Sequence, residues 1–157
     1  MSKLQAEVDL MRSIPMLANL PPHKLKLLAF ASDRVTYEPG EELFRQGDEA
    51  DAAYIVIDGQ ADVVVVPPDG GEGSVVAQLG PNSFVGDMAI VADIPRTATV
   101  RARKRLDALR IRRDHMMDMI RDTPDLAMEI LRELVDRLAK TTHDLSEARA
   151  EIARLSH

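Results

Sequence analysis

The sequence has 157 residues, enough for one domain with a substantial core. Its 45% hydrophobic and 29% charged residues are typical of a globular protein, and no apolar run approaches the roughly 20 residues that cross a membrane. The absence of cysteine excludes disulfides, thiolate chemistry and cysteine-bound zinc. Because the start also lacks the basic-then-apolar order of a signal peptide, we expect a cytoplasmic protein without a membrane partner.

The net charge of −6 is unevenly distributed: residues 1–100 carry −8 and residues 101–157 carry +2. A protein that binds nucleic acid needs a basic face. The cluster that comes nearest to one is Arg101, Arg103, Lys104 and Arg105. Alternation along a strand would place its arginines on one face, which we interpret as a solvated surface. Nucleic acid is therefore not an expected partner.

Two short amphipathic helices are predicted at the start of the chain. Apolar side chains recur at helical spacing over residues 3–14 and again over residues 21–32, where Pro22 suits a first helical turn. From Val35 to Ile111 the chain changes to short β-rich runs, such as YIVI and SVVAQL, separated by glycine turns. Regular short strands with such turns indicate a jelly roll.

The predicted fold class is α+β, with a β jelly-roll barrel flanked by N-terminal helices and a long C-terminal helix. The chain divides into N-terminal helices over residues 1–33, a β-roll over residues 34–112 and C-terminal helices over residues 113–157. Pro124, with Thr123 as its cap, is expected to open the last helix.

The last helix carries apolar residues at alternating spacings of three and four, the a/d pattern of a coiled coil. As one helix, residues 124–156 would be about 50 Å long, against roughly 30 Å for a small domain. Packing on its own β-roll remains an alternative for the first half, whereas the far half needs a partner. A second copy of the chain is the simplest one, so we predict a homodimer. The expected seam consists of Leu131, Leu134, Leu138, Thr141, Leu145, Ala148, Ile152 and Leu155.

The segment GDMAIVADIPRTATV, residues 86–100, contains Arg96, the single basic residue between Gln46 and Val100. Nine acidic residues share that stretch. The forked guanidinium suits phosphate oxygens, and the MAIVA that follows Asp87 can form a helical turn whose first amides point at an anion.

Neighbouring residues complete this candidate site. Gly86 allows close approach of the backbone, Asp87 can accept hydrogen bonds from hydroxyl groups, and Thr97 adds a hydroxyl and an amide. Such a set describes a site for a sugar phosphate with one charge. From spacing alone, an alternative remains open in which Arg96 forms a surface ion pair with Asp93 or Asp87.

The segment resembles the phosphate-binding cassette of the cyclic nucleotide-binding domain family. This is the regulatory domain of bacterial cAMP receptor proteins, cyclic-nucleotide-dependent kinases and gated channels. The resemblance extends from about residue 11 to residue 145: YEPGEELFRQGDEADAAYIVIDGQADVVV resembles the first strands of the family, and MRSIPMLANLPPHKLKLLAFAS resembles its N-terminal helices.

The resemblance implies a cyclic nucleotide as the ligand and assigns roles to the cassette. Arg96 would bind the cyclic phosphate, and Asp87 would accept a hydrogen bond from the ribose 2′-hydroxyl. The family usually has Glu at the position of Asp87, so this carboxylate is one methylene shorter. The backbone and hydroxyl groups that would complete the phosphate cradle belong to Gly86, Met88, Ala89 and Thr97.

The residues that would contact the nucleotide base are inferred from the segment LVDRLAKTTHDL. This segment resembles the long helix of bacterial cAMP receptor proteins. Thr141 and Thr142 match a pair of hydroxyl residues that reach the adenine there, one from each subunit. A polar residue that sets the register of the seam is the alternative role for Thr141. Thr97 matches a threonine that is associated with cGMP in related kinase domains. We expect cAMP, with cGMP as the alternative.

These features predict a stand-alone bacterial regulatory protein without enzyme activity, cofactor, catalytic residue or metal site. The chain ends at His157, with no room for a helix-turn-helix, so it is expected to act through its dimer or an unknown protein partner, or as a piece of a longer protein. Ligand is expected to draw Arg96 inward and to rearrange the C-terminal helices. The alternative is a dimerisation scaffold of the same fold that binds no nucleotide or binds cGMP.

Overall fold

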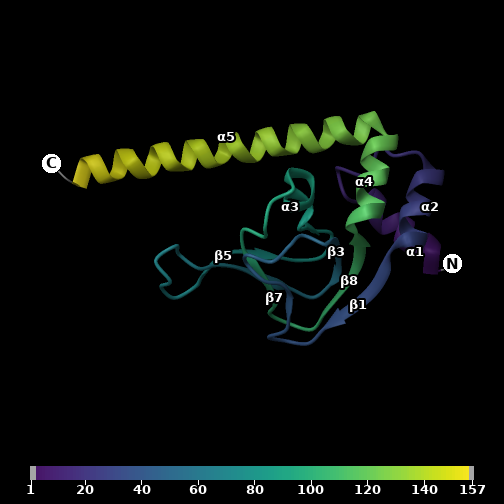
Figure 1. Ribbon diagram of the computed structural model, residues 1–157, viewed down its shortest axis with the longest axis horizontal. Coiled ribbons are helices and arrows are strands. Elements are labelled where there is room, and N and C mark those ends of the chain that lie inside the picture. Colours follow the sequence, from purple (N-terminus) through teal and green to yellow (C-terminus); the bar gives the residue numbers. More distant parts are fainter. Residues whose placement is uncertain (1–2, 156–157) are drawn as a thin grey trace.

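Figure 1 shows the computed structural model, which describes residues 3–155. Within these residues, no helix is long and apolar enough to cross a membrane. The elements in chain order are α1 (Lys3–Arg12), α2 (Pro22–Ala31), β1 (Asp33–Tyr37), β2 (Glu42–Phe44), β3 (Ala52–Asp58), β4 (Ala61–Val65), β5 (Ser74–Leu79), β6 (Phe84–Val85), α3 (Asp87–Ala92), β7 (Thr99–Ala102), β8 (Leu106–Arg112), α4 (Arg113–Asp122) and α5 (Pro124–Leu155).

The strands form two four-stranded sheets. One has the order β1, β8, β3, β6 and the other the order β2, β7, β4, β5, and the neighbouring strands are antiparallel. The predicted α+β fold is confirmed, with N-terminal helices and a long C-terminal helix around a jelly-roll-like pair of sheets. The two sheets do not close into one continuous barrel.

Strand β3 connects two hydrophobic cores because side chains alternate across a strand. Ile55 packs in the core beneath the helices, whereas its neighbours Tyr54 and Val56 pack in the core between the sheets. This double burial explains the unbroken apolar run AAYIV. The helices cover the first core with apolar residues at the predicted spacing, including Val8, Met11, Leu25, Leu28 and Met116.

Among the described residues, the apolar side chains of α5 enter the hydrophobic core only over the first turns of the helix. Leu126 and Ile130 are buried and Leu134 packs against the same core, but every described residue from Val135 onward is exposed. With 32 residues, the helix is about 48 Å long at 1.5 Å per residue, and Figure 1 shows it passing over α3 and beyond the sheets. The far half therefore has no covering within the chain.

Leu134 packs against the core of its own domain, as expected where the first half of α5 lies on its own β-roll. Beyond it, exposed apolar side chains continue along one side of the helix among the described residues. Thr142 lies four residues after Leu138 on this side, and Thr141 lies three residues after Leu138 at its edge. We call the exposed set the α5 stripe: Leu131, Val135, Leu138, Leu145 and Ile152 are each between 52% and 67% exposed.

The joint between α4 and α5 is held by α2. The ammonium group of Lys24 donates to the Asp122 carbonyl at 2.8 Å and to the Thr123 hydroxyl at 2.7 Å. Thr123 does precede α5 as predicted, but its hydroxyl is engaged by Lys24 and by the sulfur of Met119 at 3.9 Å. The position of Thr123 before α5 was predicted correctly, and its hydroxyl accepts a hydrogen bond that links α2 to the joint between α4 and α5.

Replacing Lys24 by methionine should loosen this joint. The substitution Lys24→Met removes both bonds while keeping the apolar stem, and should lower the free energy of unfolding by about 1.5–3 kcal/mol. Amide hydrogen exchange around Thr123 should accelerate. The matched control is Lys26→Met on the exposed side of α2. Equal stability of the two variants in urea denaturation would contradict the role of Lys24.

Candidate functional site

The cassette begins with a turn that requires glycine. Gly86 ends the β6 segment with φ of 83° and ψ of 7°, in the left-handed region, and α3 follows directly. The predicted helical turn after Gly86 is thus present. A Cβ at this position would lie 2.6 Å from Nη1 of Arg96 and 3.1 Å from Cε2 of Phe44, so glycine also provides space for these two side chains.

Arg96 points into the protein, and its side chain is 1% exposed. Its backbone is fixed by the turn before β3, because its amide donates to the Asp48 carbonyl and its carbonyl accepts from the Gly47 amide, both at 2.8 Å. Nη1 donates to the Gly86 carbonyl at 2.7 Å, and Nη2 donates to the Ala52 carbonyl. The guanidinium therefore connects the cassette to β3.

A surface ion pair does not explain Arg96. Asp93 pairs with Arg113 at 2.7 Å, and the ion pair found for Arg96 among residues 3–155 is with Asp51 at 3.8 Å. The Asp51 side chain is 65% exposed, so solvent screens its charge. Burial lowers the pKa of Arg96, while Asp51 and other nearby groups act in the opposite direction. The cation is thus buried, and its one described ion pair is long and with a carboxylate that is mostly in solvent.

The Nε atom of Arg96 is buried and has no hydrogen-bond partner within the described part of the chain. Buried polar groups of folded proteins are nearly always paired, so an unpaired donor of a charged group is unusual. It leaves one edge of the guanidinium able to donate to an anion.

Asp87 lies at the start of α3 and is 3% exposed. Burial raises the pKa of its carboxyl group, the Arg137 cation lowers it, and the Glu133 carboxylate raises it. The backbone N–H groups of Asp87 and Met88 also lower this pKa. The carboxylate is thus held beneath α5, away from bulk solvent.

The other predicted cassette residues lie around these two charges. Ala89 is 7% exposed, Met88 is 37% exposed, and Thr97 is exposed directly after Arg96. Met88 accepts a hydrogen bond from Arg137 of α5 through its sulfur, and Arg137 also pairs with Glu133. Helix α5 therefore contacts the cassette itself.

Thr141 and Thr142 are exposed on α5 and are not brought into contact with the cassette. Thr141 lies one helical turn beyond Arg137, on the face that Arg137 and Leu134 direct toward their own domain. Thr142 lies four residues after Leu138 and shares the face of the α5 stripe. The two threonines therefore point to different sides of the helix.

Sequence reasoning missed Phe44, Asp51 and Arg137. A signal existed for Arg137, because a basic residue four positions before Thr141 must share its helical face. Phe44 and Asp51 lie more than forty residues from Arg96 in the chain, and no local pattern connects them.

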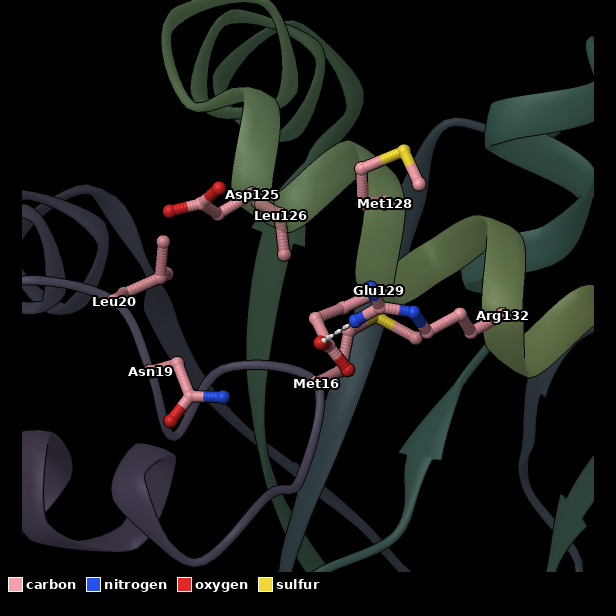
Figure 2. A pocket seen from close by; sticks show the side chains of 8 residues that line it. All are labelled: Met16, Asn19, Leu20, Asp125, Leu126, Met128, Glu129 and Arg132. Carbon is pink, nitrogen blue, oxygen red and sulfur yellow. Dashed lines mark hydrogen bonds and ion pairs between the residues drawn. The ribbon is translucent and has the colours of Figure 1, made fainter.

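The cavity in Figure 2 is separate from the cassette. It has a volume of about 340 Å³ and lies beside the first turns of α5, where Glu129 and Arg132 form an ion pair at 2.6 Å. Arg96 and Asp87 do not line it. Its lining consists of Met16, Asn19, Leu20, Asp125, Leu126, Met128, Glu129 and Arg132.

Residues 34–123 match the cyclic nucleotide-binding domain family, and this is more than half of the chain. The chain belongs to the cyclic nucleotide-binding domain family. The short helix after Gly86, which the sequence predicts, lies within the matched residues.

Curated relatives include transcription factors and kinase subunits. The CRP-like cAMP-activated global transcriptional regulator of Mycobacterium tuberculosis is 28% identical over 126 residues, which cover 80% of this chain and 56% of that protein. The cAMP-dependent protein kinase regulatory subunit of Dictyostelium discoideum is 33% identical over 94 residues, covering 59% of this chain and 29% of that one. The chain thus spans about half the length of the first relative and less of the second.

Solved structures share the fold. The catabolite activator protein of Thermus thermophilus has a TM-score of 0.75 and 27% identity, covering 84% of this chain and 62% of that one. The sensor domain of the transcriptional regulator DNR from Pseudomonas aeruginosa has a TM-score of 0.81 and 24% identity, covering 91% of this chain and 95% of that one.

Substituting Gly86 should test the contact between the cassette and Arg96. Gly86→Ala introduces left-handed strain and a clash with Nη1 of Arg96, whereas Gly40→Ala introduces the same strain at φ of 89° in open space. We expect Gly40→Ala to cost about 1–2 kcal/mol and Gly86→Ala about 1–3 kcal/mol more. Chemical denaturation measures both values. Equal losses would show that Arg96 does not occupy the space beside Gly86.

Proposed function

We propose that this chain is a cyclic nucleotide-binding regulatory protein whose ligand is cAMP, and that it signals through α5 from the cytoplasm. The observation that carries the proposal is the buried Arg96 with its unpaired Nε, at the cassette of a family of cyclic nucleotide-binding domains. A cyclic phosphate has one negative charge, which would supply the missing counter-charge.

The proposed contacts follow the roles that the family resemblance implies. Arg96 binds the cyclic phosphate, and Asp87 accepts a hydrogen bond from the ribose 2′-hydroxyl. The phosphate cradle is completed by the Gly86, Met88 and Ala89 backbone and by Thr97. The shorter Asp87 carboxylate and its burial favour a weaker ribose contact than Glu would make.

Access to these contacts requires α5 to move. Arg96 and Asp87 are each 3% exposed, and Arg137 of α5 contacts Met88 of the cassette. Arg96 points inward and donates to the Gly86 and Ala52 carbonyls. The proposed change is a shift of α5 about the joint that Lys24 holds, which separates Arg137 from Met88.

The base contacts are proposed for Thr141 and Thr142. Thr141 lies on the side of α5 that faces its own domain, and Thr142 shares the face of the α5 stripe. In a homodimer paired along this stripe, Thr142 would face the partner copy. This arrangement supports one hydroxyl from each subunit.

The choice of cAMP rests on similarity. The Mycobacterium tuberculosis relative is described as cAMP-activated and the Dictyostelium relative as cAMP-dependent. Thr97 favours cGMP as the alternative ligand. A scaffold that keeps the fold and the dimer without binding a nucleotide is the second alternative, and its partner would then be a protein that recognises α5.

We do not propose nucleic acid as a partner, because carboxylates lie close to the arginines of the basic cluster. Arg103 lies 3.7 Å from Asp62 and Arg105 lies 3.8 Å from Glu38. Arg101 faces Glu42 across the strands β7 and β2. These pairs leave little uncompensated positive charge for a polyanion.

Calorimetry with cAMP and cGMP tests the ligand. The wild-type chain should bind cAMP with micromolar or lower dissociation constant and cGMP more weakly, and Arg96→Ala should weaken cAMP binding about 100-fold. Arg101→Ala, an exposed arginine of β7, is the control and should bind as the wild type does. Absence of binding heat for both nucleotides, with a folded wild-type protein, would favour the scaffold.

Sedimentation of an α5 variant tests the dimer. Leu138→Glu places a charge in the α5 stripe, where Leu138 is 67% exposed, and should raise the dimer dissociation constant more than about tenfold. Lys140→Glu introduces the same side chain two residues away on the polar face and should leave the dimer intact. A similar response of both variants would exclude the stripe as the interface.

A further inference from the structure

We propose that Phe44 is a positioning residue for Arg96, which holds the guanidinium in place for an anion by a cation–π contact instead of an ion pair. The inference rests on the proposed function, since the anion is the phosphate of the nucleotide. It concerns a residue that the cassette sequence itself does not contain.

The geometry of this contact is direct. Phe44 is the last residue of β2, and Cζ of Arg96 lies 3.9 Å from the centroid of its ring. A cation within about 6 Å of an aromatic centroid is attracted by the electrons of the ring face. On the cassette side, Gly86 leaves no Cβ between the two groups.

Other aromatic residues hold the Phe44 ring. Its centroid lies 6.0 Å from that of Tyr54, and Tyr54 is in edge contact with Tyr37 at 6.4 Å. Tyr54 is 3% exposed, and its hydroxyl donates to the Leu43 carbonyl at 3.4 Å. The ring is thus part of a fixed aromatic row inside the roll, which gives Arg96 a rigid surface.

The charges around Arg96 show that the Phe44 ring takes the place of a close ion pair. Arg96 is buried, and Asp51, its partner at 3.8 Å, is mostly in solvent. A close ion pair would have to be broken before a phosphate could bind. An aromatic face stabilises the cation without occupying its hydrogen-bond donors, so these donors stay available to a phosphate.

The remaining donors define where an anion would enter. A guanidinium has five N–H donors, and the bonds described for Arg96 go to the Gly86 and Ala52 carbonyls. The Nε edge is unpaired and can donate to a phosphate oxygen, while one face of the guanidinium lies against Phe44. Phe44 therefore fixes the plane of the guanidinium, and the two carbonyls fix which of its donors are occupied.

The first readout uses ligand-free protein and needs no nucleotide. The Nε–H resonance of Arg96, identified by its loss in Arg96→Ala, should be shifted upfield by the ring current of Phe44. The shift should disappear in Phe44→Leu and persist in Phe44→Tyr. The matched control is Phe84→Leu, which removes a partly buried ring of β6 instead, and the shift should persist there too. An unchanged resonance in Phe44→Leu would overturn the proposal.

The second readout is the affinity for cAMP. Phe44→Leu should weaken binding about tenfold, while Phe44→Tyr and Phe84→Leu should stay within about twofold of the wild type. Equal weakening by the leucine and tyrosine variants would overturn the proposal, because a packing role does not require recovery by another aromatic ring. If the wild type binds neither nucleotide, the proposed function fails, while the Arg96 resonance still decides the role of Phe44.

Discussion

The buried charge of Arg96 constrains the rest of the structure. Removing a guanidinium from water is unfavourable unless its charge and donors are compensated. Here the compensation comes from the carbonyls of Gly86 and Ala52 and from the ring of Phe44. These groups belong to the cassette turn, to β3 of one sheet and to β2 of the other. The position of the cassette and the packing of the two sheets therefore depend on the same cation.

Helix α5 extends this dependence to the surface. Among the described residues, its anchors include its first turns, the joint at Thr123 and the contact between Arg137 and Met88. Its far half is exposed and apolar along the α5 stripe. Under the proposed function, a partner on the α5 stripe and a ligand at the cassette would influence each other's affinity, because Arg137 of α5 contacts Met88 of the cassette.

The fold was predictable because its signals are local. Glycine turns between short apolar runs indicated the sheets, and helical spacing indicated the helices. The candidate residues of the cassette could be proposed from the sequence for the same reason, since Gly86 to Thr97 form one contiguous segment of the chain. For the first half of α5 the sequence left two partners open, its own β-roll and a second chain, because a spacing of three and four describes an apolar stripe without showing which part faces the domain. The environment of Arg96 depends on strands β2 and β3, whose approach is a property of the tertiary structure.

The fixed position of Arg96 has a consequence for how a ligand could act. A ligand shifts a conformational equilibrium only by the difference between its affinities for the two states. Because Arg96 is held by Gly86, Ala52 and Phe44, none of which belongs to α5, its contact with a phosphate would contribute similarly whichever way α5 is oriented. Under the proposed function, such a contact would anchor the ligand without switching the protein. The switching energy would then come from cassette groups that interact with α5, such as Asp87 and Met88.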